Sequence, residues 1–241
     1  MLLQAALNGA RPAGAHPLLP VTREALAAAA AESVAAGAGA IHAHSRGSDG
    51  GESLAAADID RLVLAIRQAL PSTPLGVSTG AWIAGSGAER QDLVAGWSEL
   101  PDFASVNFDE PGAASLARLL LRRGIGVEAG LSDEHATCHL AESGLADECL
   151  RVLLEPQAQD LSVALGIADR IEAVLESSGI RCPRLLHGTE ATAWLLLDEA
   201  ARRGYDARIG LEDILRLPDG TPADGNRALV VEARRRLEAR A

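Results

Sequence analysis

Short apolar runs alternate with longer amphipathic stretches along the whole chain. The apolar runs are short and predict strands. The amphipathic stretches predict helices, for example Arg23–Ala36 after a Thr22 cap, Asp58–Leu70, Leu161–Ser177 and Asn226–Arg240. We therefore expect eight strands, each followed by a helical stretch: Leu2–Asn8, Ala38–His44, Leu75–Thr79, Phe103–Phe108, Ile125–Ala129, Cys149–Glu155, Arg184–His187 and Asp206–Leu211.

The repeat of strand and helix predicts the fold class. Eight repeats in 241 residues favour a compact (β/α)8 TIM barrel over a doubly wound sheet. No linker or low-complexity segment interrupts the pattern, so residues 1–241 are expected to form a single barrel domain. In such barrels catalytic groups lie where strands end and the following loops begin, so polar residues at those places are the first candidates for chemistry.

Composition narrows the classes of partner and of chemistry. The net charge of −11 provides no basic field for phosphates, which argues against a nucleic-acid partner. The chain contains no lysine, so a lysine Schiff base and covalently held pyridoxal phosphate are excluded. If the protein stabilises an enolate, a metal is therefore the expected electron sink.

The cysteines and the apolar segments point to a compartment. Cys138, Cys149 and Cys182 show no CxxC spacing and are expected to be free thiols in a reducing cytoplasm. We expect no signal peptide, because no charged segment followed by a long apolar core opens the chain. No apolar run is long enough to span a bilayer, so no membrane partner is expected.

The segment Ala40–Ser45 carries two histidines in alternating positions. Because side chains alternate along a strand, His42 and His44 are expected to project to the same side. Two imidazoles from one strand can bind one Zn²⁺, with a carboxylate as third ligand and the fourth position open. Two unrelated surface histidines would give the same pattern, but the position at the end of the second predicted strand favours a metal site.

The segment Arg208–Asp213 closes the eighth predicted strand, which lies near the second strand around the barrel mouth. Glu212 is the natural carboxylate to complete a site of two histidines and one acid. Asp213 is then available as a base, and Arg208 as an anion partner or as a group that tunes a neighbouring pKa. Taken alone, Glu212 and Asp213 would be interpreted as caps of the next helical turn.

Hydroxyl and amide groups at the ends of the third and fourth strands form a third candidate group. Ser78, Ser105 and Asn107 could hold a substrate carboxylate or an oxyanion. Ordinary N-capping of the following helix explains these residue types equally well, and for Thr79 it is the stronger interpretation.

Three further polar residues have two interpretations each. Thr189 follows His187 and Gly188, and it is either a helix cap or part of an anion site. Glu128 and Glu155 end the fifth and sixth strands. Ion pairs with the many arginines explain these two acids at least as well as substrate contact does.

As an ordered set, these segments resemble the β-keto acid cleavage enzyme family, whose prototype acts on 3-keto-5-aminohexanoate. The resemblance implies Zn²⁺ held by His42, His44 and Glu212, with Asp213 as general base tuned by Arg208. It implies substrate contacts from Ser78 and Ser105, with Asn107 beside them. It covers nearly the whole chain: Leu7–Arg11, His16–Thr22, the His42/His44 pair, Ser78–Gly80, Ser105–Phe108, Leu185–Gly188, Arg208–Asp213 and Leu217–Gly220.

The resemblance also implies the reaction and the assembly. A β-keto acid and acetyl-CoA are expected to exchange acyl units, giving acetoacetate and a new acyl-CoA, in a homo-oligomer that is a dimer or a tetramer. Two other functions stay open. One is a zinc-assisted C–C bond lyase or hydrolase that does not use CoA. The other is a non-catalytic barrel, which the presence of every metal and base residue disfavours.

Two departures from the family pattern bear on the substrate. Arg11 stands where the family prototype has an acid that pairs with the substrate ammonium. Because a guanidinium attracts anions, we expect a substrate with a negative or neutral polar tail, such as a β-keto diacid. The alternative is that Arg11 pairs with a nearby acid, such as Glu128 or Glu155, and does not contact the substrate. The loops after strands four to six are also short, which affects the expected contacts with acyl-CoA.

Overall fold

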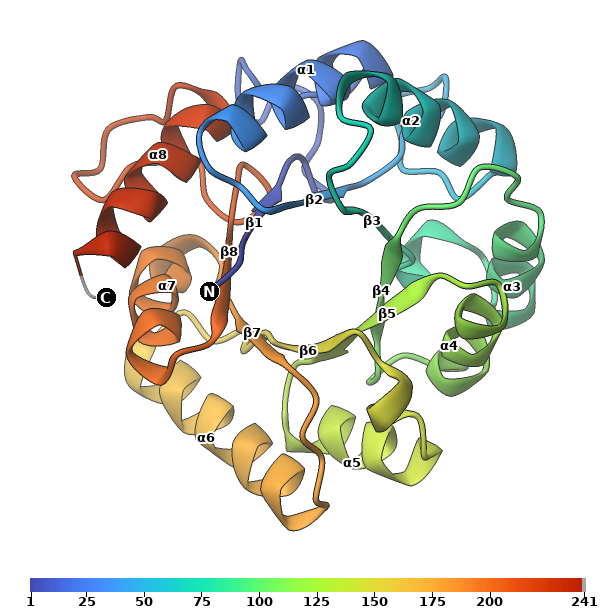
Figure 1. The fold of residues 1–241 in the computed structure, drawn as a ribbon, viewed down its shortest axis with the longest axis vertical. Coiled ribbons are helices and arrows are strands. Elements are labelled where there is room, and N and C mark those ends of the chain that lie inside the picture. The colour runs from blue at the N-terminus through green and yellow to red at the C-terminus, as the bar shows by residue number, and fades with distance from the viewer. Residues whose placement is uncertain (240–241) are drawn as a thin grey trace.

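A closed barrel of eight parallel strands forms the centre of the molecule, and helices surround it (Figure 1). The computed structural model describes residues 1–239; Arg240 and Ala241, which end the predicted helix and domain, lie outside the described residues. The strands are β1 (Leu3–Ala6), β2 (Ala40–Ala43), β3 (Leu75–Ser78), β4 (Phe103–Asn107), β5 (Gly126–Leu131), β6 (Arg151–Leu154), β7 (Arg184–Leu186) and β8 (Asp206–Ile209).

The strands pair in chain order, and β8 pairs with β1 to close the ring. Ala6 of β1 pairs with His42 of β2, and Ala5 of β1 pairs with Ile209 of β8. The predicted (β/α)8 TIM barrel is therefore confirmed. One consequence matters for the chemistry: only β1 separates the ends of β2 and β8.

Eight helices cover the outside of the barrel in the described residues (Figure 1). The strand side chains are almost wholly buried, because the helices cover the outer face of the barrel. The helices are α1 (Arg23–Ala35), α2 (Ala56–Ala69), α3 (Gly87–Ala95), α4 (Ala113–Arg122), α5 (Glu134–Ser143), α6 (Leu161–Ser177), α7 (Ala193–Arg203) and α8 (Gly225–Glu238), with short 3₁₀ turns η1 (Ala81–Ile83), η2 (Ala146–Glu148) and η3 (Glu190–Thr192).

All eight predicted strands are present, but most of them end earlier than the apolar pattern suggested. Asn8 and His44, expected as the last residues of their strands, lie beyond β1 and β2. The side-chain amide of Asn8 donates to the backbone oxygen of His44 and accepts from its backbone N–H, each at 2.9 Å. A side chain thus replaces the backbone ladder at the point where the loops begin.

Three smaller expectations can be compared with the fold. The hydroxyl of Thr22 accepts a hydrogen bond from the backbone N–H of Ala25, so the predicted cap of α1 is confirmed. Cys138, Cys149 and Cys182 are free thiols. Within residues 1–239, none of the helices has the length and apolar character that crossing a membrane requires.

Candidate metal centre and active site

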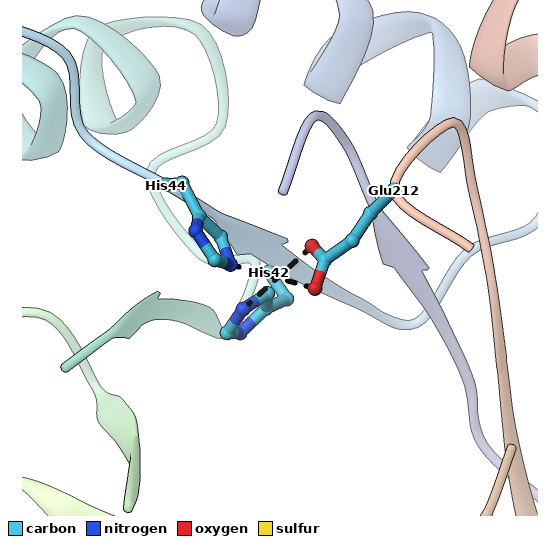
Figure 2. A group of neighbouring side chains, drawn as sticks. All are labelled: His42, His44 and Glu212. Atoms are coloured by element: carbon cyan, nitrogen blue, oxygen red, sulfur yellow. Dashed lines mark ion pairs between the residues drawn. The ribbon is translucent and has the colours of Figure 1, made fainter. Parts of the chain in front are cut away.

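Two strand ends bring a set of possible metal ligands together. His42 lies in β2, His44 just beyond it, and Glu212 in the loop after β8 (Figure 2). One ligand atom from each of these residues lies within 4.8 Å of the other two. Nε2 of His42 is 3.8 Å from Oε2 of Glu212, and Nε2 of His44 is 3.4 Å from Oε1. Two imidazoles and one carboxylate form the protein ligand set of many catalytic zinc centres.

A glycine lets Glu212 reach across the end of β1. Gly9 follows β1 with a φ of +56°, a conformation that residues with a side chain rarely adopt. A Cβ atom at this position would lie 2.4 Å from Cγ of Glu212. Two constraints therefore favour glycine at position 9. Its backbone conformation is unfavourable for other residues, and a side chain there would occupy the space of Glu212.

The electrostatics of the triad fit a bound cation. Oε2 of Glu212 is buried and has no hydrogen-bond partner among the described residues. Burial lowers the pKa of His42 to about 3. Burial also opposes the charged form of His44, but the carboxylates of Glu212 and Glu52 outweigh it and raise the pKa of His44 to about 9. Without a metal, protonated His44 supplies the positive charge that the carboxylates of Glu212 and Glu52 favour at this place.

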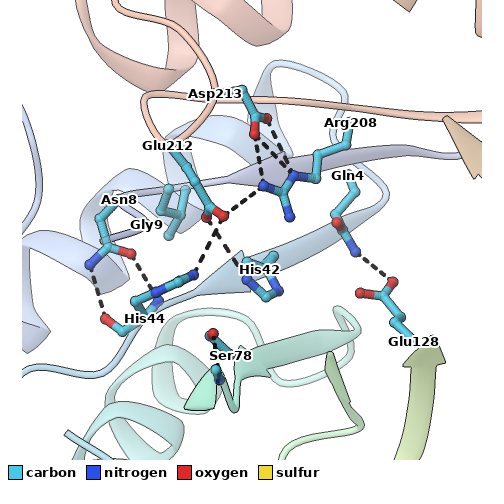
Figure 3. Close-up of polar contacts among 12 residues, drawn as sticks. Gln4, Asn8, Gly9, His42, His44, Ser78, Glu128, Arg208, Glu212 and Asp213 are labelled. Atoms are coloured by element: carbon cyan, nitrogen blue, oxygen red, sulfur yellow. Dashed lines mark hydrogen bonds and ion pairs between the residues drawn. The ribbon is translucent and has the colours of Figure 1, made fainter. Parts of the chain in front are cut away.

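Arg208 bridges the two acids that follow β8 (Figure 3). Its Nη2 donates to Oε1 of Glu212 at 2.6 Å and to Oδ1 of Asp213 at 2.7 Å. Burial opposes the ionisation of both acids. At Glu212 the charges of Arg208 and the two histidines outweigh burial and hold the pKa well below its usual range. At Asp213 burial dominates and raises the pKa. The two neighbouring acids thus have different tendencies, one to stay ionised and one to take up a proton.

A cavity of about 460 Å³ opens at the carboxyl ends of the strands. Ser78 and Ser105 are register partners on β3 and β4, and Asn107 is two residues further along β4. Asp213 is completely buried behind the cavity wall. The predicted site residues that line the cavity are Arg11, His42, His44, Ser78, Ser105, Asn107, Arg208 and Glu212.

Comparison with known families matches residues 1–240 to the model of the beta-keto acid cleavage enzymes. The chain belongs to the β-keto acid cleavage enzyme family. The match spans the segments on which the resemblance was based, so that prediction is confirmed. No curated protein matches the chain in sequence.

Solved structures of ObcA are similar to this family member, each with a TM-score of 0.72. They are an apo structure at 20% identity, a binary complex with oxaloacetate at 21%, and a ternary complex with a C4-CoA adduct and oxalate at 20%. Each covers 93% of this chain, whereas this chain spans only 62–64% of the ObcA chains.

The structure of 3-hexulose-6-phosphate synthase has a TM-score of 0.59 and 17% identity, and the match covers 98% of this chain and 99% of that chain. At these identities, the likeness to the solved structures establishes the shared fold.

Arg11 lies in the cavity wall, but its partner differs from the expected ones. Arg11 does pair with an acid, as the alternative expected, but that acid is neither Glu128 nor Glu155. Nη2 of Arg11 is instead 2.5 Å from Oε1 of Glu190, and its Nε donates to the backbone oxygen of Glu212 at 3.1 Å. The side chain of Glu190 is 55% exposed, so the acid that pairs with Arg11 lies at the rim and meets solvent.

The two acids that were expected to end the fifth and sixth strands have different positions and surroundings. Glu128 lies inside β5, and Glu155 lies directly after β6. Glu128 is completely buried and accepts a hydrogen bond from Gln4 at 2.8 Å (Figure 3). Its Oε1 is also 3.2 Å from Nε of Arg151, which favours the ion-pair interpretation. Glu155 lines the cavity, and its Oε2 is 3.3 Å from Nε2 of His187, which also lines the cavity.

The capping expected of Thr79 is wrong. Its hydroxyl donates to the backbone oxygen of Ser105 at 2.6 Å and so joins β3 to β4 beside the cavity. Thr189 lies at the first position before η3, but its side chain makes no capping hydrogen bond. It lines the cavity instead, and its hydroxyl accepts from the amide of Gln159 at 3.2 Å.

Sequence reasoning missed two residues beside the triad, Glu52 and Trp82. Oε1 of Glu52 is 2.5 Å from Nδ1 of His44, and Oε2 accepts from the indole N–H of Trp82 at 2.9 Å. The usable signal was the glycine-rich segment Gly47–Gly51 directly after the histidine pair, because such a turn returns the chain to the strand end.

Proposed function

We propose that this protein is a zinc-dependent β-keto acid cleavage enzyme that exchanges acyl units between a β-keto acid and acetyl-CoA. The products are acetoacetate and a new acyl-CoA. The observation that carries the proposal is the triad of His42, His44 and Glu212 at the mouth of a barrel from this family. The ObcA complexes with oxaloacetate and with a C4-CoA adduct support a keto acid and a CoA thioester as substrates.

The cavity residues divide into two roles. His42, His44 and Glu212 would hold the metal and leave one position for a substrate oxygen. A bound zinc ion supplies a Lewis acid that polarises the keto group and makes the neighbouring C–H acidic. Ser78, Ser105 and the amide of Asn107 provide hydrogen bonds for the substrate carboxylate from the β3 and β4 wall.

Asp213 is the proposed general base for the C2 proton, which lies between the two carbonyl groups of the substrate. Its raised pKa suits proton uptake. Because the carboxylate is completely buried, the proton needs a relay. His187 lines the cavity and its Nδ1 lies 3.8 Å from Oδ1 of Asp213, so its imidazole is the proposed relay. Arg208 fixes Asp213 in orientation and balances its charge.

The exchange forms one C–C bond and breaks another. C2 of the keto acid bonds to the acetyl carbon, and the CoA sulfur is transferred to the former keto carbon. The bond between that carbon and C2 then breaks, and C2 takes back the proton that Asp213 had removed, so the acetyl group and the carboxymethyl group leave together as acetoacetate. No lysine takes part, in keeping with a sequence that has none.

Arg11 is proposed to select the tail of the keto acid. Its guanidinium lies in the cavity wall and is already paired with one carboxylate, that of Glu190. A substrate carboxylate of suitable reach would compete for the same planar donors. A β-keto diacid is therefore the proposed substrate class, and oxaloacetate belongs to it.

Assembly and location complete the proposal. We expect one barrel domain, a dimer or tetramer in solution, and a cytoplasmic location in keeping with three free thiols. Light scattering on the purified protein measures the assembly, and a strictly monomeric profile would contradict it.

A substrate panel tests the activity. The protein is incubated with β-keto acids of different tails and acetyl-CoA, and acyl-CoA products are identified by mass spectrometry. The proposal expects acetoacetate and one new acyl-CoA in equal amounts, and no reaction without acetyl-CoA. Cleavage of the keto acid without acetyl-CoA would favour the alternative, a zinc-assisted C–C bond lyase or hydrolase that does not use CoA.

A further inference from the structure

Glu52 contacts the face of the metal site that points away from the cavity. Its Oε1 lies 2.5 Å from Nδ1 of His44, while Nε2 of the same ring lies 3.4 Å from Glu212. The two ring nitrogens therefore have separate tasks. A carboxylate can only accept at Nδ1, so Nδ1 carries a hydrogen. When His44 gives up its other proton to bind a metal, the free lone pair is therefore on Nε2, on the side of the triad.

Glu52 is not a fourth ligand. The ring of His44 stands between its carboxylate and Glu212, and the group of ligand atoms that lie close together contains only His42, His44 and Glu212 among the described residues. Its contact resembles the outer carboxylates that orient histidine ligands in metalloproteins.

The loop after β2 is folded so that Glu52 returns to His44. Arg46 and Glu52 form an antiparallel bridge, and Gly47 donates to the backbone oxygen of Gly51 at 2.8 Å. Nη2 of Arg46 also donates to the backbone oxygen of Gly9 at 2.5 Å, which links this loop to the loop after β1. The position of Glu52 is thus fixed by the backbone.

Trp82 holds the second oxygen of Glu52. Its indole N–H donates to Oε2 at 2.9 Å, and its ring lies over Gly80, where a Cβ atom would be 2.3 Å from the ring. The side chain is 57% exposed and lines the cavity mouth. Trp82 thus contacts Glu52, and Glu52 contacts His44. This chain of two hydrogen bonds connects the mouth of the cavity to the proposed metal site.

His42 provides an internal comparison. Its Nδ1 is buried and has no hydrogen-bond partner in the part of the chain that the structure describes. Of the two histidine ligands, only His44 thus has a carboxylate on its outer nitrogen.

We propose that Glu52 is a positioning residue of the metal centre, which keeps Nε2 of His44 free for the metal, and that Trp82 holds Glu52 in place. This inference rests on the proposed zinc site. It predicts that metal affinity depends on a hydrogen-bond acceptor at position 52 and on a donor at position 82.

Zinc affinity of the metal-free protein, measured by competition with a chromophoric chelator, tests the inference. Glu52→Ala should weaken binding by about ten- to a hundredfold, the usual range for an outer carboxylate. Glu52→Gln keeps a neutral acceptor oxygen and should recover part of that loss. Trp82→Phe keeps an aromatic ring, smaller than the indole, but removes the donor, and should weaken binding roughly two- to tenfold, the scale of one hydrogen bond. Glu24→Ala, at an exposed surface pair with Arg23, is the control.

Two results separate the inference from the proposed function. If the wild-type protein binds no zinc, the proposed function fails. If the wild type binds zinc and Glu52→Ala binds it equally well, the positioning role is refuted while the zinc site stands. Circular dichroism of each metal-free variant checks folding, and Trp82→Phe supplies an independent answer if Glu52→Ala does not fold. The ring N–H resonance of His44 in the zinc-loaded protein should disappear in Glu52→Ala and persist in Glu52→Gln.

Discussion

The two walls of the cavity are built differently. On the metal wall, formed by β1, β2 and β8, charged side chains bind one another: Arg208 holds Glu212 and Asp213, and Glu52 holds His44. On the opposite wall, formed by β3 to β7, groups stay available. His187 lies 3.3 Å from Glu155, but neither of its ring nitrogens makes a hydrogen bond within the described residues. We infer that the metal wall is organised before substrate arrives, whereas the proposed substrate contacts come from polar groups of the opposite wall.

Loop length follows the same division. The segments between strand and helix run over residues 7–22 after β1, 44–55 after β2 and 210–224 after β8. On the other side, only Ser132 and Asp133 separate β5 from α5, and residues 108–112 separate β4 from α4. Long loops fold back and supply partners such as Gly9, Arg46 and Glu52. The short loops agree with the expectation from sequence, and any acyl-CoA contacts have to be made without long β4–β6 loops.

The largest effect is expected at the base. Asp213→Asn keeps the size of the side chain and one of the two oxygens that accept from Arg208, but it cannot take up a proton. It should retain the metal and the fold while kcat falls at least about a hundredfold, the usual scale for a general base. Exchange of the substrate C2 protons in deuterated water should stop. Exchange at the wild-type rate would assign the base to another group. Asp219→Asn, in an exposed turn, is the control.

The next effect tests how tightly the metal wall is packed. Gly9→Ala puts a methyl group against Glu212, so zinc affinity should fall by about tenfold or more, as when a ligand loses its orientation. Gly14→Ala is a matched control, because Gly14 also has a positive φ (+96°) but nothing lies within 4 Å of its added Cβ. Both variants should lose about 1 kcal/mol of stability from backbone strain. Equal zinc affinity in the two variants would show that Gly9 serves only the backbone.

Arg11, in the loop after β1, pairs with Glu190, which follows β7, and so links the two walls. Its substitution should change the order of preference among substrates. Arg11→Glu should lower kcat/KM for anionic substrates by about tenfold or more, the scale of a charge-assisted hydrogen bond, and improve cationic ones. Glu190→Gln removes the competing carboxylate and should change kcat/KM in the opposite direction for the same anions. Equal losses on all substrates would mean that Arg11 only supports the loop.

The smallest effect belongs to the opposite wall. Ser105→Ala removes one neutral hydrogen bond, so KM should rise roughly two- to tenfold with little change in kcat. Ser105→Thr keeps the hydroxyl and should behave like the wild type. A loss as large as that of Asp213→Asn would contradict the division of the two walls.

The sequence predicted the parts of this molecule that follow local rules. Buried strands leave apolar runs, and alternation along a strand places His42 and His44 together, so the barrel and the metal triad could be inferred. The partner of Arg11 could not be inferred. Glu190 begins the short turn η3 at the rim of the cavity, and the pattern of apolar and polar residues does not predict where such a turn lies. The same holds for Glu52: its contact with His44 depends on how residues 44–55 turn back.

Thr79 illustrates a second limit. A threonine before a helical turn predicts a cap, and the rule is sound for isolated helices. In the barrel, the neighbouring strand β4 presents the backbone oxygen of Ser105 at 2.6 Å, and the hydroxyl donates there instead. Tertiary contact outweighs the local preference at the place where strands meet the cavity.

The metal content of the protein tests the central claim most directly. Elemental analysis of protein purified without chelator should find about one zinc ion per chain, because two imidazoles and a carboxylate complete the protein ligand set. His42→Ala should lose that zinc while keeping the fold, as judged by circular dichroism. A wild-type protein without zinc, or a His42→Ala variant that retains a full equivalent, would contradict the account.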